Sequence, residues 1–257
     1  MQIFGRTQPL SRYPIEECLG VISRVGFDGV EICLENKDIA PDKLTAQVIE
    51  TIRGRLADLG LASYSVSYHK NYIYNDSIFR ETKEVIPLIR SFGTEVFVFG
   101  DTRKRGGDQE EWKLMIERTR ALVEIAADHG VIMAKEFEPG FIVGSTEDLL
   151  KMFHQVPSPN LAANLDLGHV FLCDPEPIQA IHQLGDKIAH CHIENMKAGV
   201  HNHLLPQEGD MDLSVYLKAL AEVGFNGGMA LDLYKHDYEA VAGECIAYIR
   251  ELLKGIE

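Results

Sequence analysis

Five stretches of the chain share one pattern, in which an amphipathic segment ends at a glycine and a run of β-branched and apolar residues follows. The glycines are Gly26, Gly60, Gly93, Gly130 and Gly224. Glycine commonly follows the last turn of a helix because it tolerates the left-handed backbone conformation found there. The first four are separated by 33 to 37 residues, which is the length of one strand, one helix and their two loops. The spacing predicts repeated β/α units.

Extending this pattern along the chain predicts eight strands that alternate with eight helices. The strands are expected near residues 2–6, 28–34, 61–67, 95–100, 131–137, 161–166, 187–193 and 227–233. The helices are expected near residues 14–25, 43–59, 77–92, 108–129, 145–155, 175–184, 213–224 and 237–254. Eight such units in about 250 residues are typical of a (β/α)₈ TIM barrel. We therefore expect one TIM barrel domain spanning residues 1–257. An open doubly wound sheet is the main alternative, but no G-x-G-x-x-G motif follows the first strand.

Charge and composition narrow the class of partner. The 39 acidic residues exceed the 25 basic ones and give a formal net charge of −14, which repels a nucleic-acid backbone and favours a small polar substrate. No run of about 18 apolar residues is present, and the N-terminal residues lack a secretory pattern. The protein is therefore expected to be cytoplasmic, with no membrane partner. The scattered cysteines argue against a disulfide framework.

Ionisable side chains gather at the ends of the last four predicted strands, which is where TIM barrels carry their active sites. They are Glu136, Glu138, Asp166, His190, His192 and Asp232. Strand alternation turns the two glutamates to one face and the two histidines to one face. Several carboxylates in one pocket repel each other unless a cation neutralises them. The pattern predicts one divalent metal ion, for which Mn²⁺, Zn²⁺, Co²⁺, Fe²⁺ and Mg²⁺ all remain open.

Longer motifs then suggest a family. GVIMAKEFEPG, ANLDLGHVF, IAHCHIEN, an H-x-H…EGDMDL segment and GFNGGMALDLY occur in the order seen in the xylose-isomerase-like TIM barrels, which the chain resembles. That superfamily contains sugar and sugar phosphate isomerases and epimerases, inosose and dehydroshikimate dehydratases, and an apurinic endonuclease branch that the net charge disfavours. GFDGVEICL and SVSYHKNY are also similar to it, so the resemblance covers nearly the whole chain. It further suggests a homo-oligomer.

The resemblance implies roles for individual residues. The implied metal ligands are Glu136, Asp166, His192 and Asp232, with Glu138 open as an alternative to Glu136. His69 and His169 are implied to line the substrate pocket. Glu31, at the end of the second strand, is expected to face the substrate. His203, together with His201, lies in a long segment that forms either a lid over the substrate or an ordinary surface stretch.

The implied activity is that of a metal-dependent isomerase or epimerase of a sugar, sugar phosphate or cyclic polyol. In this hypothesis Glu136, or else Glu138, removes a proton next to a metal-bound carbonyl and leaves an enediolate, and Asp232 is the second catalytic group. Asp232 stands where epimerases of this group usually carry a longer glutamate, and Asn195 stands where the family often has aspartate. The shorter side chain keeps two alternatives open, which are a metal-dependent dehydratase and a catalytically inert sugar-binding barrel.

Two other features have competing interpretations. His190 is expected to be a hydrogen-bonded histidine inside the barrel rather than a ligand. The loop from Asp101 to Asp108 carries three basic residues that are either a phosphate grip or, as we expect, a solvated surface loop. They are Arg103, Lys104 and Arg105.

Overall fold

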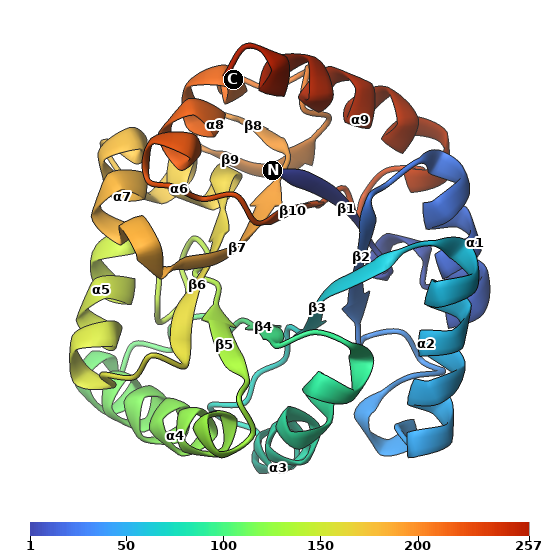
Figure 1. Cartoon of the computed structure of the whole chain (residues 1–257). Helices are drawn as coiled ribbons and strands as arrows, with labels where there is room; N and C mark the ends of the chain where they lie inside the picture. The colour runs from blue at the N-terminus through green and yellow to red at the C-terminus, as the bar shows by residue number, and fades with distance from the viewer. Residues whose placement is uncertain (257) are drawn as a thin grey trace.

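Eight parallel strands close into a barrel in the computed structural model, which describes residues 1–256 (Figure 1). Their order around the barrel is β1-β10-β7-β6-β5-β4-β3-β2. The strands are β1 (Gln2–Arg6), β2 (Gly29–Cys33), β3 (Ala62–Tyr68), β4 (Val96–Phe99), β5 (Ile132–Lys135), β6 (Leu161–Asp166), β7 (Ile188–Ile193) and β10 (Gly228–Leu231). The predicted (β/α)₈ TIM barrel is confirmed, and β1 closes it by pairing with both β2 and β10.

Helices surround the barrel as an outer ring (Figure 1). They are α1 (Ile15–Val25), α2 (Ala46–Leu59), α3 (Asp76–Val85), α4 (Asp108–Asp128), α5 (Thr146–Gln155), α6 (Leu167–Cys173), α7 (Pro177–Leu184), α8 (Leu213–Glu222) and α9 (Tyr238–Lys254). Short 3₁₀ helices are η1 (Gln8–Leu10), η2 (Pro41–Lys43), η3 (Ile86–Phe92) and η4 (Gly185–Lys187). All five glycines that were expected to follow helices have positive φ angles.

One predicted helix is divided in two. The segment near 77–92 forms α3 and then continues as the 3₁₀ helix η3, whose second residue is Pro87. Proline has no backbone N–H and its ring collides with the preceding turn, so it ends an α-helix. Asn75 starts α3, because its side chain accepts hydrogen bonds from the amides of Ser77 and Ile78.

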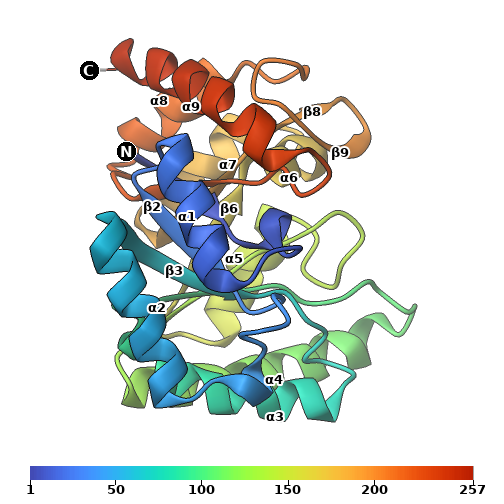
Figure 2. The same cartoon turned by 90° about the vertical axis from the view of Figure 1, so that its right-hand side faces the viewer.

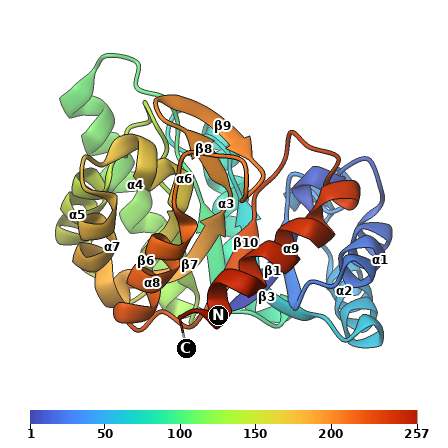
Figure 3. The ribbon, with the colours of Figure 1, turned by 90° about the horizontal axis from the view of Figure 1, so that it is seen from above.

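A hairpin and a short helix were not predicted. β8 (Asn195–Lys197) and β9 (Val200–Leu204) pair antiparallel in the segment that follows β7. The helix α6 begins directly after β6, where the Asp166 side chain accepts a hydrogen bond from the amide of His169. In Figures 2 and 3 the hairpin lies at the end of the barrel opposite the two chain termini. The hairpin therefore lies over the end of the barrel that is formed by the C-terminal ends of the strands.

The outward side of β5 carries a buried ion pair. Ala134 belongs to a small apolar cluster with Val96 and Val98 that is separate from the main core. Lys135 points to the other side of the strand, as strand alternation predicts. Its Nζ lies 3.2 Å from Asp101 Oδ2, and neither side chain is exposed. Burial raises the pKa of Asp101 and lowers the pKa of Lys135.

Two further findings bear on the class of protein. All five cysteines are free thiols, which agrees with the absence of a disulfide framework expected from their spacing. Within residues 1–256, no helix has both the length and the apolar character needed to span a membrane.

Candidate active site

A fully buried histidine, His192 on β7, lies at the centre of three carboxylates. Its Nδ1 is 3.0 Å from Glu136 Oε2, 3.9 Å from Asp166 Oδ2 and 3.9 Å from Asp232 Oδ2. These carboxylates come from the ends of β5, β6 and β10, and the ends of parallel barrel strands converge. The structure thus brings together all four residues that the resemblance implied as ligands. We call these four residues the carboxylate ring.

Glu31 lies behind His192 rather than in the cavity. Its Oε2 is 3.0 Å from His192 Nε2, and its side chain is completely buried. This contact fixes the imidazole so that Nδ1 faces the carboxylates of Glu136, Asp166 and Asp232. Burial would lower the pKa of His192, but Glu31 and Glu136 outweigh it and raise that pKa to about 10. Where no cation is bound, His192 is therefore protonated and supplies part of the positive charge that neutralises the carboxylates.

Sequence reasoning missed Arg6, at the end of β1. Its Nε lies 2.8 Å from Glu31 Oε1, and its Nη1 forms an ion pair with Asp232 Oδ2. Burial would raise the pKa of Asp232, but Arg6 and the nearby histidines hold it below its ordinary value. An arginine at the last position of a barrel strand was the available signal, because such positions face the active site.

Two oxygens of the carboxylate ring have no partner. Asp166 Oδ2 and Asp232 Oδ1 are buried and accept no hydrogen bond from any residue in the described part of the chain. A buried carboxylate oxygen without a partner is costly. Suitable atoms of Glu136, Asp166 and His192 all lie within 4.8 Å of one another. Oxygen and imidazole donors at this spacing, with free lone pairs, fit a divalent metal ion.

A cavity of about 220 Å³ opens beside the carboxylate ring. It is lined by Arg6, Gln8, His69, Glu136, Glu138, His169, His201, His203, Asp232 and Tyr234. His69, His169 and His203, which were expected to contact substrate, therefore line the cavity. His69 also places its Nε2 3.1 Å from Glu136 Oε2. Glu31 does not line the cavity. A larger cleft of about 720 Å³, between Tyr64 and Asp186, lacks such converging carboxylates and histidines.

The two glutamates after β5 occupy different environments. Burial would raise the pKa of Glu136, but His192 and His69 outweigh it and hold that pKa well below its ordinary value. Glu138 lines the same cavity outside the carboxylate ring, and burial raises its pKa to about 7. The structure thus places Glu136 among the ring residues and Glu138 at the cavity wall.

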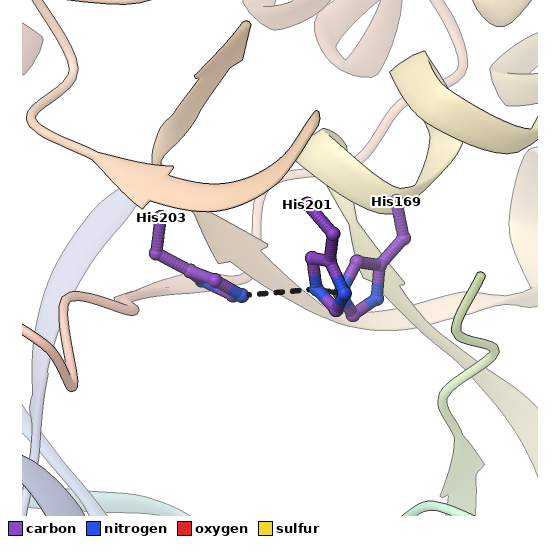
Figure 4. A group of neighbouring side chains, drawn as sticks. All are labelled: His169, His201 and His203. Carbon is purple, nitrogen blue, oxygen red and sulfur yellow. Dashed lines mark hydrogen bonds between the residues drawn. The ribbon is translucent and has the colours of Figure 1, made fainter. Parts of the chain in front are cut away.

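Three histidines meet at the mouth of the cavity (Figure 4). His169 comes from the first turn of α6, and His201 and His203 come from β9. His201 Nε2 lies 3.0 Å from His169 Nε2 and 3.3 Å from His203 Nε2. Burial lowers the pKa of His201 to about 4, so its ring is neutral at neutral pH. We call these three residues the histidine cluster.

His190 lies inside the barrel, and most of the loop from Asp101 to Asp108 lies at the surface. His190 Nδ1 lies 2.8 Å from Asn164 Oδ1 and its Nε2 lies 2.9 Å from Ser65 Oγ, as expected for a histidine inside the barrel. In the 101–108 loop, Arg103 packs on the ring of Phe141. The three basic residues of this loop are exposed and do not line the cavity, which agrees with a surface loop.

A model of the xylose isomerase-like TIM barrel family matches residues 19–252. The chain belongs to this family. It is 24% identical over 262 residues to fructoselysine 3-epimerase of Escherichia coli O157:H7, covering 94% of each chain. It is 26% identical over 258 residues to inosose isomerase of Bacillus velezensis, covering 94% of this chain and 91% of the relative.

Solved structures share the fold. A probable 3-DHS dehydratase from Bacillus anthracis has a TM-score of 0.84 at 16% identity, covering 97% of this chain and 99% of the other. The IOLI protein, solved with a zinc atom, has a TM-score of 0.81 at 21% identity, covering 100% and 98%. A family member from Mycobacterium smegmatis in complex with magnesium has a TM-score of 0.79 at 20% identity, covering 99% and 97%.

Proposed function

We propose that this protein is a metal-dependent isomerase or epimerase of a sugar, sugar phosphate or cyclic polyol. The observation that carries the proposal is the carboxylate ring, whose two unpartnered oxygens lie beside a small polar cavity. Relatives that span most of the chain are an epimerase and an isomerase. A cavity of about 220 Å³ suits a small molecule rather than a polymer.

The carboxylate ring would hold the metal. Asp166 and Asp232 offer their free oxygens, and Glu136 and His192 offer Oε2 and Nδ1. Glu31 orients His192 through the opposite ring nitrogen, which is the usual way a second residue fixes a ligating histidine. A bound divalent ion supplies Lewis-acid stabilisation of negative charge on a substrate oxygen.

We assign proton transfer to Glu138, the second of the two glutamates after β5. Glu138 lines the cavity, and its pKa of about 7 matches the requirement that a proton carrier be poised near the working pH. Glu136 stays ionised, because His192 and His69 stabilise its charge. His69 and His169 lie on the cavity wall and would contact substrate hydroxyls there.

One observation favours a metal-dependent dehydratase as the second candidate. Epimerisation needs a proton carrier on each face of a substrate carbon, and Asp232 is the predicted second carrier. Its Oδ2 is held by Arg6 in a buried ion pair, which opposes protonation of this carboxylate. Isomerisation and dehydration need only one face. The fold of a probable dehydratase also superposes on 97% of the chain.

The test combines metal loading with a substrate panel. Protein loaded with Mn²⁺ is offered ketoses, ketose phosphates and keto-cyclitols, and products are identified by NMR and mass spectrometry. A product of unchanged mass supports an isomerase or epimerase, and a product lighter by one water supports a dehydratase. We expect Glu138→Gln to abolish turnover and keep the metal, whereas Asp232→Asn loses metal. The matched variant Glu147→Gln, on α5, keeps both. Metal-loaded protein that binds sugars without turnover refutes the enzyme and leaves the inert barrel.

A further inference from the structure

Asn195, at the start of β8, uses every hydrogen-bonding position of its buried side chain. Its Nδ2 donates to the carbonyl oxygens of Pro206, at 2.8 Å, and Met211, at 3.1 Å. Its Oδ1 accepts from the amides of Met196, at 2.9 Å, and Met211, at 3.0 Å. Carbonyl oxygens only accept and amides only donate, so the carboxamide fits these partners in a single orientation. We call Asn195 with its four hydrogen bonds the Asn195 clamp.

The Asn195 clamp joins the two ends of a long excursion of the chain. Asn195 lies where the chain leaves β7, whereas Pro206 and Met211 lie where it returns toward α8. The β8–β9 hairpin lies between these points and carries His201 and His203, which line the cavity. One buried side chain therefore fixes the base of the hairpin.

The two ends of the excursion are also packed closely together. A Cβ atom on Gly209 would collide with the carboxamide of Asn195, so a glycine is needed for the returning chain to approach the clamp. The amide of Asp210 donates to the carbonyl oxygen of Met196 at 2.8 Å. The carboxylate of Asp210 accepts from the amide of Ala198 at 3.0 Å. These contacts extend the effect of the clamp into the hairpin.

The opposite side of the hairpin rests on the barrel. His203 Nδ1 donates to the carbonyl oxygen of Asp232 at 3.1 Å, and His236 Nε2 donates to that of His203 at 2.6 Å. His201 meets only His169 and His203 through its ring in the structure of residues 1–256 (Figure 4). The position of the His201 ring at the cavity mouth therefore depends on where the base of the hairpin is held.

We propose that Asn195 is a positioning residue, which holds residues 196–211 as a fixed wall of the cavity and so places His201 and His203 before a substrate arrives. The inference rests on the proposed function only in the assumption that this wall meets a substrate. A buried backbone carbonyl that loses its donor is costly. Without the clamp the hairpin therefore opens locally. With it, the segment is a wall of the resting protein and not a lid that closes on binding.

Hydrogen exchange followed by NMR in a Mg²⁺ buffer tests the proposal. One hydrogen bond contributes about a factor of 5 to an opening equilibrium. In Asn195→Ala we expect the amides of Asp210 and Ala198, which Asn195 does not contact, to exchange about 100-fold faster or more. Asn195→Asp keeps the two accepted bonds and loses the two donated ones, so about 20-fold is expected. The matched variant Asn202→Ala removes one bond from the amide of Lys197 and should leave the Asp210 amide as in the wild type.

The ring of His201 gives a second readout, which a defect confined to the contacts of Asn195 would not change. Burial lowers the pKa of His201 to about 4. Once the hairpin opens, the ring meets water, and its pKa is expected to rise toward the ordinary histidine value of about 6.5. Titration of the ring signals by ¹H–¹³C NMR measures this shift in Asn195→Ala and in Asn202→Ala, where no shift is expected.

The carboxylate ring serves as the internal control, because it contains no residue of the 196–211 segment. Both Asn195 variants are expected to match the wild type in circular dichroism and in Mn²⁺ titration. The proposal is overturned if folded Asn195→Ala keeps the exchange rates and the His201 pKa of the wild type, or if the wild type already exchanges freely at Asp210 and Ala198. Should Asn195→Ala not fold, unchanged exchange in Asn195→Asp overturns it. These measurements need no substrate, so failure of the proposed function would leave them unchanged.

Discussion

The buried ion pair between Lys135 and Asp101 allows a prediction whose size depends on pH. Both side chains are fully buried, and Lys135 directly precedes Glu136 of the carboxylate ring. The substitution Asp101→Asn keeps the shape and the acceptor for the amide of Val143, but removes the carboxylate charge that pairs with Lys135. Breaking a buried pair in this way destabilises a protein by about 3–5 kcal/mol.

The pKa of an unpaired lysine sets an upper limit on the same cost. An unpaired buried lysine escapes its desolvation cost by losing its proton, which at pH 7 means moving roughly 3.5 units below the ordinary lysine pKa of 10.5. Each unit is worth about 1.4 kcal/mol, so the cost is bounded near 5 kcal/mol. At about pH 9.5 the pH lies only one unit below the ordinary lysine pKa, so the upper limit on the cost falls to about 1.4 kcal/mol.

The sign of the pH effect follows from proton counting. In Asp101→Asn the folded chain keeps Lys135 neutral, because its pKa is depressed, whereas the unfolded chain binds the proton up to its ordinary pKa. Stability of the variant therefore rises with pH between about 7 and 10. In the wild type the carboxylate of Asp101 favours the charged form of Lys135 and offsets part of this shift, so the stability of the wild type should rise with pH less than that of the variant.

Urea unfolding followed by circular dichroism, at pH 7 and about pH 9.5, measures the loss of stability and its dependence on pH. We expect the loss of unfolding free energy in Asp101→Asn to shrink by about 3 kcal/mol at the higher pH. The double variant Lys135→Met, Asp101→Asn contains no buried charge and should recover most of the stability, independently of pH. An equal loss at both pH values would refute the reasoning.

Three further predictions concern single contacts. Glu31→Gln weakens the acceptor that orients His192, so calorimetric titration with Mn²⁺ should show affinity reduced by about 10-fold or more; unchanged affinity would contradict the assigned role. Gly228→Ala places a methyl group against the ring of Phe4, so thermal unfolding should show destabilisation of about 3 kcal/mol, and a stable variant would show that the ring can move. Asn75→Ala removes the cap of α3 and should cost about 1 kcal/mol in urea unfolding; a loss near zero would mean that solvent replaces the cap.

The barrel could be predicted because its signals are local. Each helix-terminating glycine requires a positive φ angle, as Gly26 and Gly60 show with φ angles of 97° and 66°, and each strand is a compact apolar run. Strand alternation then indicates which side chains share a face, which explains why Glu136 and His192 meet. These inferences need no knowledge of distant partners.

Features that depend on distant partners could not be predicted. Arg6 is paired with Asp232, 226 positions away, and nothing near either residue indicates that contact. Glu31 was expected to end a strand and face substrate, yet it lies in the middle of β2, and His192 and Arg6 hold it behind the carboxylate ring. The β8–β9 hairpin was missed because its strands are short and rich in polar residues, which gives a weak apolar pattern.

The closure of the barrel by β1 and β10 bears on how the chain is synthesised. Ile3 pairs with Met229 and Gly5 with Leu231, so β1 acquires its second neighbour only after β10 has left the ribosome. Until then β1 has an open edge, and open edges promote aggregation. Asp232 arrives with β10, next to Arg6 on β1. Closure of the barrel by β10 and completion of the carboxylate ring are thus one event, and a translation product interrupted before β10 is expected to have neither a closed barrel nor a full set of ligands.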